Sequence, residues 1–447
     1  MEKGGEGSSI FYRSSLKKEY PKIDHGEGVY LIDQNGKKYI DGLANAGVVN
    51  MGYFVPEVVD AMAEQAKKLP FLQTTDFTSQ IQEDVARKVV EWAPEGMNKV
   101  YFSLSGAQAN EIALKLARQY HMETGNPNKF RVIGRWQSYH GYSLGSISMS
   151  GRTGWRKNYA PYLMNFPHIP LPYCYRCPFK LVYSDCGIEC AYELERVIRQ
   201  EESGTISAFI AETISGMSCG AVIPPKEYFP IIRSICDKYN VLLILDEVIT
   251  GIGRTGKTFA IKHWDVVPDM IATAKGITGG FAPLAVTIVK QKIYDAIYNG
   301  SGSFADGITF SGHPVSCAAS VATLNYLEKN KLVERVEKIG AYFLENLLPL
   351  RDMDIVGDVR GKGLLLAVEF VSDKKSKASF PRSKKVFENV KSAALAKGLV
   401  IGGGVGTADG VDGDICVMTP PFIITKEEVD KAIEILKSAI EDVQKTI

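Results

Sequence analysis

Apolar runs separated by amphipathic stretches occupy the middle of the chain. Short runs bounded by polar or small residues are typical of buried strands: KVYFSLSG, FRVIG, ISAFIAE, VLLILDE, PDMIATAKG and LAVTIVK. Between them, AQANEIALKLARQY and PPKEYFPIIRSICDKYN carry apolar residues at helical spacing, such as Ile112 and Leu116 in the first and Phe229 and Ile232 in the second. This order of strands and helices predicts right-handed crossovers and a parallel sheet.

The two ends of the chain carry a different pattern. Residues 28–53 alternate like strands joined at a Gln-Asn-Gly turn, which predicts a hairpin, and a helical pattern follows from Pro56. Beyond residue 330, helical and strand patterns alternate again, and the glycine-rich stretch 402–414 is expected to be a loop. We predict an α/β fold with the N-terminal part of a small domain at 1–54, a large domain at 55–325 and the C-terminal part of the small α+β domain at 326–447.

The candidate chemistry lies in residues 241–280, where Asp246 is predicted at the end of one strand and Lys275 just past the end of another. Lys275 stands between Ala274 and Gly276, so nothing bulky blocks its amine, and partial burial would lower its pKa. Such an amine can form a Schiff base with an aldehyde. A buried carboxylate such as Asp246 could keep a heteroaromatic nitrogen protonated. Together they suit pyridoxal 5'-phosphate (PLP) chemistry, because this protonation maintains the ring as an electron sink.

The stretch DEVITGIGRTG, followed by AKGITGG, resembles the class III aminotransferases of PLP fold type I, and the resemblance extends over nearly the whole chain. It implies a large domain with a mostly parallel, doubly wound sheet and a smaller α+β domain. It also implies that Lys275 binds PLP covalently and moves the proton in a ping-pong transamination. The alternatives on the same fold are a racemase, a lyase or a decarboxylase.

Other motifs resemble the family's cofactor site. The stretch SLSGAQANE is similar to its S-G-[SA]-x-A-N-E element, which implies that Gly106 and Ala107 bind the cofactor phosphate through backbone amides at a helix N-terminus. Many relatives have serine where this chain has Ala107. By the same resemblance Tyr139 stacks on the cofactor ring with His140 beside it, and Val248 belongs to the cofactor-binding set.

Four further residues are assigned by the resemblance. Glu212, at the end of ISAFIAE, is expected near the cofactor, and Arg254 is a candidate both for its partner and for a substrate contact. Gly47 stands where relatives usually have a tryptophan that narrows the substrate pocket. Thr309 is expected to reach the phosphate of a neighbouring subunit, which implies an obligate homodimer with shared active sites. Alternatively, the hydroxyl of Thr309 or Ser311 caps the helix that follows.

The substrates are only partly indicated. Ile249 after Asp-Glu-Val resembles the branch that uses ω-amino acids or amines with pyruvate, so we expect an amine or ω-amino acid donor and pyruvate as the keto acid acceptor. Because Gly47 leaves room in the substrate pocket, we expect a bulkier donor. The arginine that clamps a substrate carboxylate in pyruvate-using relatives falls at Gly410 and is absent. Either another basic residue replaces it, or the substrate has no carboxylate at that place.

A different class of function is suggested by Gly251–Thr258, GIGRTGKT, which matches the phosphate-binding loop of nucleotidases. Two features oppose it. The strand that ends in a carboxylate precedes this loop, whereas a Mg²⁺-binding strand is expected after it, and Pro268 leaves little room for a long helix.

Composition excludes several partners. The chain has 447 residues, 45% hydrophobic and 23% charged, with a formal net charge of +1, so neither nucleic acid nor a membrane surface is an expected partner. Without an apolar leader or a run of about 18 apolar residues, we expect a cytoplasmic protein. Of eight cysteines, four are clustered with a spacing that suggests zinc or free thiols, and we expect thiols and no metal: Cys174, Cys177, Cys186 and Cys190.

Overall fold

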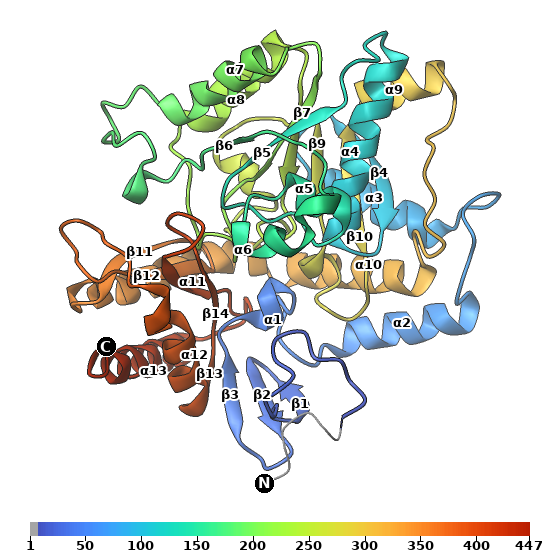
Figure 1. The fold of residues 1–447 in the computed structure, drawn as a ribbon. Coiled ribbons are helices and arrows are strands. Elements are labelled where there is room, and N and C mark those ends of the chain that lie inside the picture. Colours follow the sequence, from blue (N-terminus) through green and yellow to red (C-terminus); the bar gives the residue numbers. More distant parts are fainter. Residues whose placement is uncertain (1–7) are drawn as a thin grey trace.

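The computed structural model describes residues 8–447, and its centre is a seven-stranded sheet (Figure 1). The strand order is β4-β10-β9-β8-β7-β5-β6, in which β10 is antiparallel to both neighbours and the strands from β9 to β6 are mutually parallel. The bounds are β4 Met97–Ser103, β5 Arg131–Arg135, β6 His168–Ile169, β7 Ile206–Glu212, β8 Leu242–Asp246, β9 Met270–Thr273 and β10 Ala285–Lys290.

Helices cover both faces of this sheet. Along β8, Leu243 and Leu245 join the hydrophobic cluster that includes α8 (Tyr228–Lys238), whereas Leu242 and Ile244 join the cluster that includes α4 (Gly106–Glu123). Every residue of β7 and β8 is buried, as expected of strands covered on both faces. The predicted mostly parallel, doubly wound sheet is therefore confirmed.

Two four-stranded sheets lie in the lower part of Figure 1. The first contains the predicted hairpin and orders its strands β1-β2-β3-β13, with β13 parallel to β3, so the two ends of the chain share one sheet. The second is β11-β12-β15-β14. Their bounds are β1 Ile23–Glu27, β2 Tyr30–Asp33, β3 Lys38–Asp41, β11 Val356–Lys362, β12 Leu365–Phe370, β13 Leu399–Val400, β14 Gly402–Val405 and β15 Asp414–Met418.

The expectation of a loop from 402 to 414 is wrong in its first part, because Gly402–Val405 is strand β14, paired with β15. Glycine permits the pairing: a Cβ on Gly403 would lie 2.0 Å from the carbonyl oxygen of Ile415. The strand has almost no side chains to form a core pattern, so its sequence resembles a loop.

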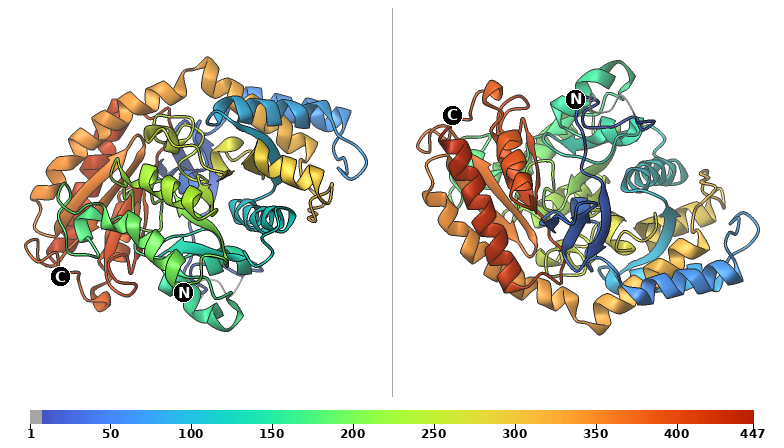
Figure 2. Two further views of the ribbon diagram at one scale, coloured as in Figure 1. Left: turned by 90° about the horizontal axis from the view of Figure 1, so that it is seen from above. Right: turned by 90° about the horizontal axis from the view of Figure 1, so that it is seen from below.

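The remaining helices enclose the sheets, and Figure 2 shows α13 and α11 along one side of the molecule. Their bounds are α1 Ala44–Gly47, α2 Pro56–Lys68, α3 Gln80–Trp92, α5 Leu144–Met149, α6 Thr153–Arg156, α7 Glu189–Gln200, α9 Gln291–Asn299, α10 Pro314–Lys329, α11 Leu332–Leu347, α12 Val386–Ala396 and α13 Lys426–Gln444. We keep the division at 54/55 and 325/326 as a proposal, with the second boundary inside α10. Within residues 8–447, no helix is long and apolar enough to cross a membrane.

Candidate active site

Lys275 lies just beyond β9, and its backbone is unusual. Its φ is +51°, a left-handed conformation that non-glycine residues rarely adopt and that is often found at functional sites. Burial lowers the pKa of the amine to about 8, although the nearby carboxylates of Asp246 and Glu212 act in the opposite direction. The structure therefore presents a partly buried amine that loses its proton more readily than an ordinary lysine does.

Asp246, the last residue of β8, is held by three hydrogen bonds. Its Oδ2 accepts from Asn110 Nδ2 at 2.8 Å and lies 2.8 Å from His140 Nδ1, while its Oδ1 accepts from the amide of Val248 at 3.0 Å. The other ring nitrogen of His140, Nε2, is buried without a hydrogen-bond partner among the described residues. The sequence reasoning missed Asn110, even though this asparagine belongs to the motif that was used to place Gly106 and Ala107.

The turn between β4 and α4 leads into a helix N-terminus at Gly106, as the sequence predicted. Ser105 caps the helix by accepting from the amide of Gln108, and Gly106 and Ala107 are the first two residues of α4, where amides have no partner within the helix. A Cβ on Gly106 would lie 2.7 Å from a methyl group of Val248, so glycine is needed for the close approach of the turn and the β8 loop. The backbone amide of Tyr139 donates to Glu212 Oε1 at 3.0 Å, and this hydrogen bond holds Tyr139 at the end of β7.

The expected ion pair between Glu212 and Arg254 is wrong. The carboxylate of Glu212 instead accepts from the amides of Tyr139 and Gly216 and from the Ser218 hydroxyl, at 2.7 to 3.0 Å. These neutral groups satisfy the carboxylate without a cation, and burial raises its pKa. A loop of this kind cannot be recognised from residue types, because its amide hydrogens are present in every sequence.

Arg254 is buried between the large sheet and the C-terminal elements. Its Nη1 donates to the carbonyls of Leu364 and Pro420 at 3.2 and 2.5 Å, and its guanidinium carbon lies 4.6 Å from the centre of the Phe422 ring. Its Nε and Nη2 are buried without a hydrogen-bond partner among the described residues. Burial lowers the pKa of Arg254 to about 9, and its charge helps to lower the pKa of Lys275.

Gly47 lies at the end of α1, a single turn whose backbone is left-handed. A Cβ on Gly47 would lie 3.7 Å from Ile249 Cγ2 and 3.8 Å from the hydroxyl of Thr419. The same segment reaches Lys275, because Asn50 Nδ2 donates to the carbonyl of Gly276 at 3.1 Å. The structure thus brings Gly47 and Ile249 together, and it places the same segment against the residue that follows Lys275.

Thr309 lies in an exposed segment before α10. Neither hydroxyl considered from the sequence caps this helix: His313 is at the N-cap position, and the Ser311 hydroxyl donates to the Phe102 carbonyl at 2.9 Å. That bond holds the segment beside the end of β4, which leads into the α4 turn.

Gly410, where relatives have an arginine, packs against Thr153, since a Cβ on Gly410 would lie 2.8 Å from the Thr153 hydroxyl.

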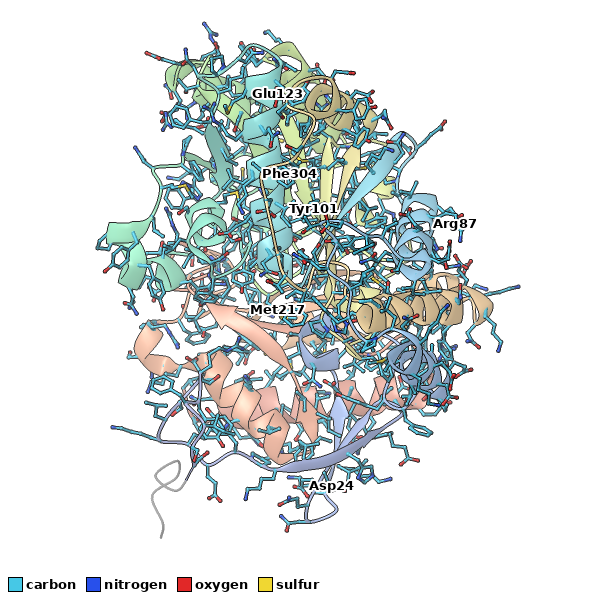
Figure 3. All side chains as sticks on the ribbon, turned by 90° about the vertical axis from the view of Figure 1, so that its right-hand side faces the viewer. Asp24, Arg87, Tyr101, Glu123, Met217 and Phe304 are labelled. Atoms are coloured by element: carbon cyan, nitrogen blue, oxygen red, sulfur yellow. The ribbon has the colours of Figure 1, made fainter. Side chains whose placement is uncertain are left out.

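An aromatic group that the sequence analysis did not identify stands beside Tyr139. Its ring packs edge to face with that of Trp155 at 4.8 Å between centres, and the guanidinium carbon of Arg152 lies 4.4 Å from the centre of the Trp155 ring. Arg152 donates to the carbonyls of Ser218 and Val405. Figure 3 shows the adjacent Met217 where the upper part of the molecule meets the C-terminal elements.

The GIGRTGKT motif does not form a phosphate-binding loop. After β8 its residues form turns that lead to a short 3₁₀ helix at Ala260–His263, so the helix N-terminus that a nucleotide phosphate requires is missing.

The clustered cysteines meet around one cavity of about 20 Å³, and none of the chain's eight cysteines is in a disulfide. Across residues 8–447, no three His, Cys, Asp or Glu side chains are arranged to hold a metal ion.

The residues present fit PLP. Lys275 supplies an amine of lowered pKa, Asp246 a buried carboxylate, and the α4 turn a cradle at Gly106 that a side chain would fill. Both the lysine and the carboxylate stand at the carboxyl ends of parallel strands, where ligands bind in open α/β sheets. This fold and this set of groups define the class of PLP-dependent transferases.

The particular family follows from comparisons with known proteins. The family described as Aminotransferase class-III matches residues 13–440. The diaminobutyrate-2-oxoglutarate transaminase of Halomonas elongata is 34% identical, covering 94% of this chain and 90% of the relative. The putrescine-pyruvate aminotransferase of Pseudomonas aeruginosa is 33% identical, covering 96% and 92%. The chain belongs to the class III aminotransferase family.

Solved structures agree. An (S)-enantioselective ω-transaminase from Thermomicrobium roseum superimposes with a TM-score of 0.92 at 35% identity, covering 98% of this chain and 96% of that chain. A second structure superimposes with a TM-score of 0.91 at 30% identity, covering 98% of each chain. It is a thermostable ω-transaminase variant in which a tryptophan is replaced by glycine, engineered for the synthesis of bulky amines. The protein is therefore a PLP-dependent transaminase, which moves an amino group from a donor to a keto acid, as the sequence predicted.

Proposed function

We propose that this transaminase uses bulky amines or long ω-amino acids as amino donors and pyruvate as acceptor, with Lys275 as its catalytic residue. The observation that carries the donor preference is Gly47 itself, which has no side chain and lies against Ile249 of the loop after β8. Pyruvate rests on Ile249 in the sequence and is the acceptor of one relative, whereas another uses 2-oxoglutarate. Both keto acids therefore belong in the test.

The proposed roles follow from the geometry. When bound, PLP supplies an electron sink that stabilises the carbanion formed at the donor carbon. The free amine of Lys275 takes the proton from that carbon and returns it at the cofactor, for which its lowered pKa is suited. Asp246 holds a proton at the ring nitrogen, and His140 and Asn110 orient its carboxylate.

The remaining proposed contacts complete the site. Gly106 and Ala107 bind the phosphate with their amides, Val248 and Tyr139 pack on the ring, and Glu212 lies beside the ring in its cage of amides and hydroxyls. We assign Arg254 to the substrate carboxylate, because its Nε and Nη2 have no partner among the described residues and its charge already acts on Lys275. Arg254 would then supply the carboxylate-binding cation that relatives have as an arginine at the place of Gly410.

The donor preference is tested by steady-state kinetics across a chain-length series of amines, with pyruvate and then 2-oxoglutarate. We expect kcat/KM to rise with donor size up to an aromatic amine, and pyruvate to be the better acceptor. Gly47→Trp should reverse the size dependence, because an indole of about 150 to 250 Å² fills the space. A flat profile, or one that favours the smallest amines, in the unmodified enzyme would contradict the proposal.

The matched control is Gly47→Ala. Gly47 has a φ of +75°, so any side chain there strains the backbone whether or not it fills the pocket. Alanine carries this strain without the indole. We therefore expect Gly47→Ala to lower stability by about 1 kcal/mol and to keep the preference for bulky donors, which separates pocket volume from backbone strain.

We further propose a homodimer in which Thr309 donates its hydroxyl to the phosphate bound in the partner subunit. Support comes from the family resemblance and from the exposed segment that carries Thr309, held to Phe102 beside the end of β4. Phe71 and Phe310, with ring centres 5.4 Å apart, are exposed in the same region, as expected of a surface that a second copy covers.

Thr309→Ala should weaken PLP binding by about 1 to 2 kcal/mol, the effect of one hydrogen bond to an anion. Heterodimers of Thr309→Ala and Lys275→Ala chains then decide which subunit supplies the hydroxyl. Their only intact lysine site draws its threonine from the Lys275→Ala chain, so it should bind PLP with unmodified affinity. Weakened affinity at that site would place Thr309 in the site of its own subunit.

A further inference from the structure

Four consecutive residues that end at Gly47 have left-handed backbone conformations. The φ angles of Ala44, Asn45, Ala46 and Gly47 are +43°, +47°, +68° and +75°. L-residues adopt this conformation singly and rarely in a run, because Cβ approaches the carbonyl oxygen. A strained run of this kind persists only when its surroundings hold it in place.

The carboxylate of Asp41 provides that hold. Asp41 is fully buried, and its Oδ1 accepts from the amide of Leu43 at 3.1 Å while its Oδ2 accepts from the amide of Asn45 at 3.1 Å. The Tyr53 hydroxyl donates to Oδ2 at 2.6 Å, and Asn45 Nδ2 donates to that hydroxyl oxygen at 2.7 Å. A closed ring of hydrogen bonds therefore joins Asp41, Tyr53 and Asn45 at the start of the left-handed run.

The left-handed run ends directly at the site. Gly47 faces Ile249, and Ile249 in turn packs against Gly216, where a Cβ would lie 2.4 Å from Ile249 Cδ1 and 3.6 Å from Glu212 Oε2. The Thr419 hydroxyl donates to the carbonyl of Leu43 at 2.7 Å and so holds the start of the turn against the C-terminal strands. The ring at Asp41 is thus connected through one turn of backbone to the wall that the donor would contact.

We propose that Asp41 and Tyr53 are positioning residues that set donor selectivity, by holding residues 44–47 in the left-handed turn that presents Gly47 to the pocket. The inference rests on the proposed function, in which Gly47 leaves room for a bulky donor. If the turn relaxes toward ordinary backbone angles, the side chain of Ala46 or Val48 moves toward the place of Gly47. Bulky donors then lose room, whereas alanine-sized donors are little affected.

The test is Tyr53→Phe in the holoenzyme, with kcat and KM measured for 1-phenylethylamine and for the small amine 2-aminopropane, both with pyruvate as acceptor. Loss of the hydroxyl breaks the ring of hydrogen bonds but keeps the aromatic ring. We expect the ratio of kcat/KM for the bulky donor over the small donor to fall about 3- to 10-fold, mainly through KM, as expected for losing one typical hydrogen bond. The absorbance of the bound cofactor should not change.

Tyr39→Phe is the matched control, because the Tyr39 hydroxyl donates to the carboxylate of Asp33 at 3.1 Å on the neighbouring hairpin, away from the site. We expect Tyr39→Phe and Tyr53→Phe to lower stability by similar small amounts, and Tyr39→Phe to change the selectivity ratio by less than about 2-fold. Equal effects of Tyr53→Phe and Tyr39→Phe on the ratio would overturn the inference. So would an equal fall of kcat/KM for both donors in Tyr53→Phe, which is what a purely structural role predicts.

A second pair of variants tests the turn without altering Tyr53. Asn45→Ala removes the side-chain amide that is bonded to the Tyr53 hydroxyl and also disfavours the positive φ angle. Asn45→Gly removes the same side-chain amide but favours the positive φ angle. Selectivity should fall in the alanine variant and be largely kept in the glycine variant. Equal ratios in the two would overturn the role of the left-handed turn. Full activity of Lys275→Ala would instead refute the proposed function.

Discussion

Lys275→Ala is expected to abolish transamination while leaving a folded protein. Lys275 is an amine near the strand-end carboxylates of Asp246 and Glu212, whose charges act on its pKa. Without it, no group in the proposed site binds the cofactor covalently or moves the proton at the donor carbon. The measurements are the amine transfer rate, the visible absorbance of the lysine-bound cofactor and the thermal unfolding temperature. Both the rate and the absorbance should be lost.

Lys257→Ala is the matched control. This lysine is exposed in the GIGRTGKT loop after β8, and it would be essential if that loop bound nucleotide phosphates. A surface substitution of this kind changes stability by no more than about 0.5 kcal/mol, so activity should stay normal. Retained turnover in Lys275→Ala, or loss of turnover in Lys257→Ala, would contradict the proposed assignment.

Asp246→Asn should lower kcat about 100- to 1,000-fold, the range found when one preorganised electrostatic contact is removed. The amide has nearly the same shape and still accepts from the Val248 amide, so the turn and the bound cofactor should remain. It lacks the negative charge that stabilises a protonated ring nitrogen, and the chemical step slows. Single-turnover kinetics with saturating donor measures that step, and near-normal rates would show that Asp246 does not serve the ring.

The neighbouring carboxylate supplies a control for Asp246→Asn. Glu247 is also fully buried, but its oxygens accept from the amides of Ala260 and Ile261 at 2.6 and 2.8 Å and from nearby threonines, so it anchors the loop after β8. Glu247→Gln should therefore lower the unfolding temperature and change kcat by less than about 5-fold. A large loss of kcat there would mean that any change at this strand end disturbs catalysis.

The sequence alone was sufficient for the large sheet and for the lysine and carboxylate at its edge. Strands such as LLILD are continuous apolar runs because helices cover both faces, and Asp246 and Lys275 stand where such runs stop. These are local signals, since each depends on a few neighbouring residues. The same holds for the turn at Gly106, which a strand, small residues and a helix start define together.

Only the tertiary structure decided which groups meet. The partners of Glu212 are backbone amides and the Ser218 hydroxyl, rather than Arg254, because a loop folds its own N–H groups onto the carboxylate. Strand β14 looks like a loop in the sequence because its pairing depends on close backbone approach at glycines. The left-handed turn at 44–47 is joined to the carboxylate of Asp41 by the amides of Leu43 and Asn45. Side-chain pattern determined the elements, whereas hydrogen bonds to backbone amides, which residue types do not encode, determined how the loops around Glu212 and Asp41 fold.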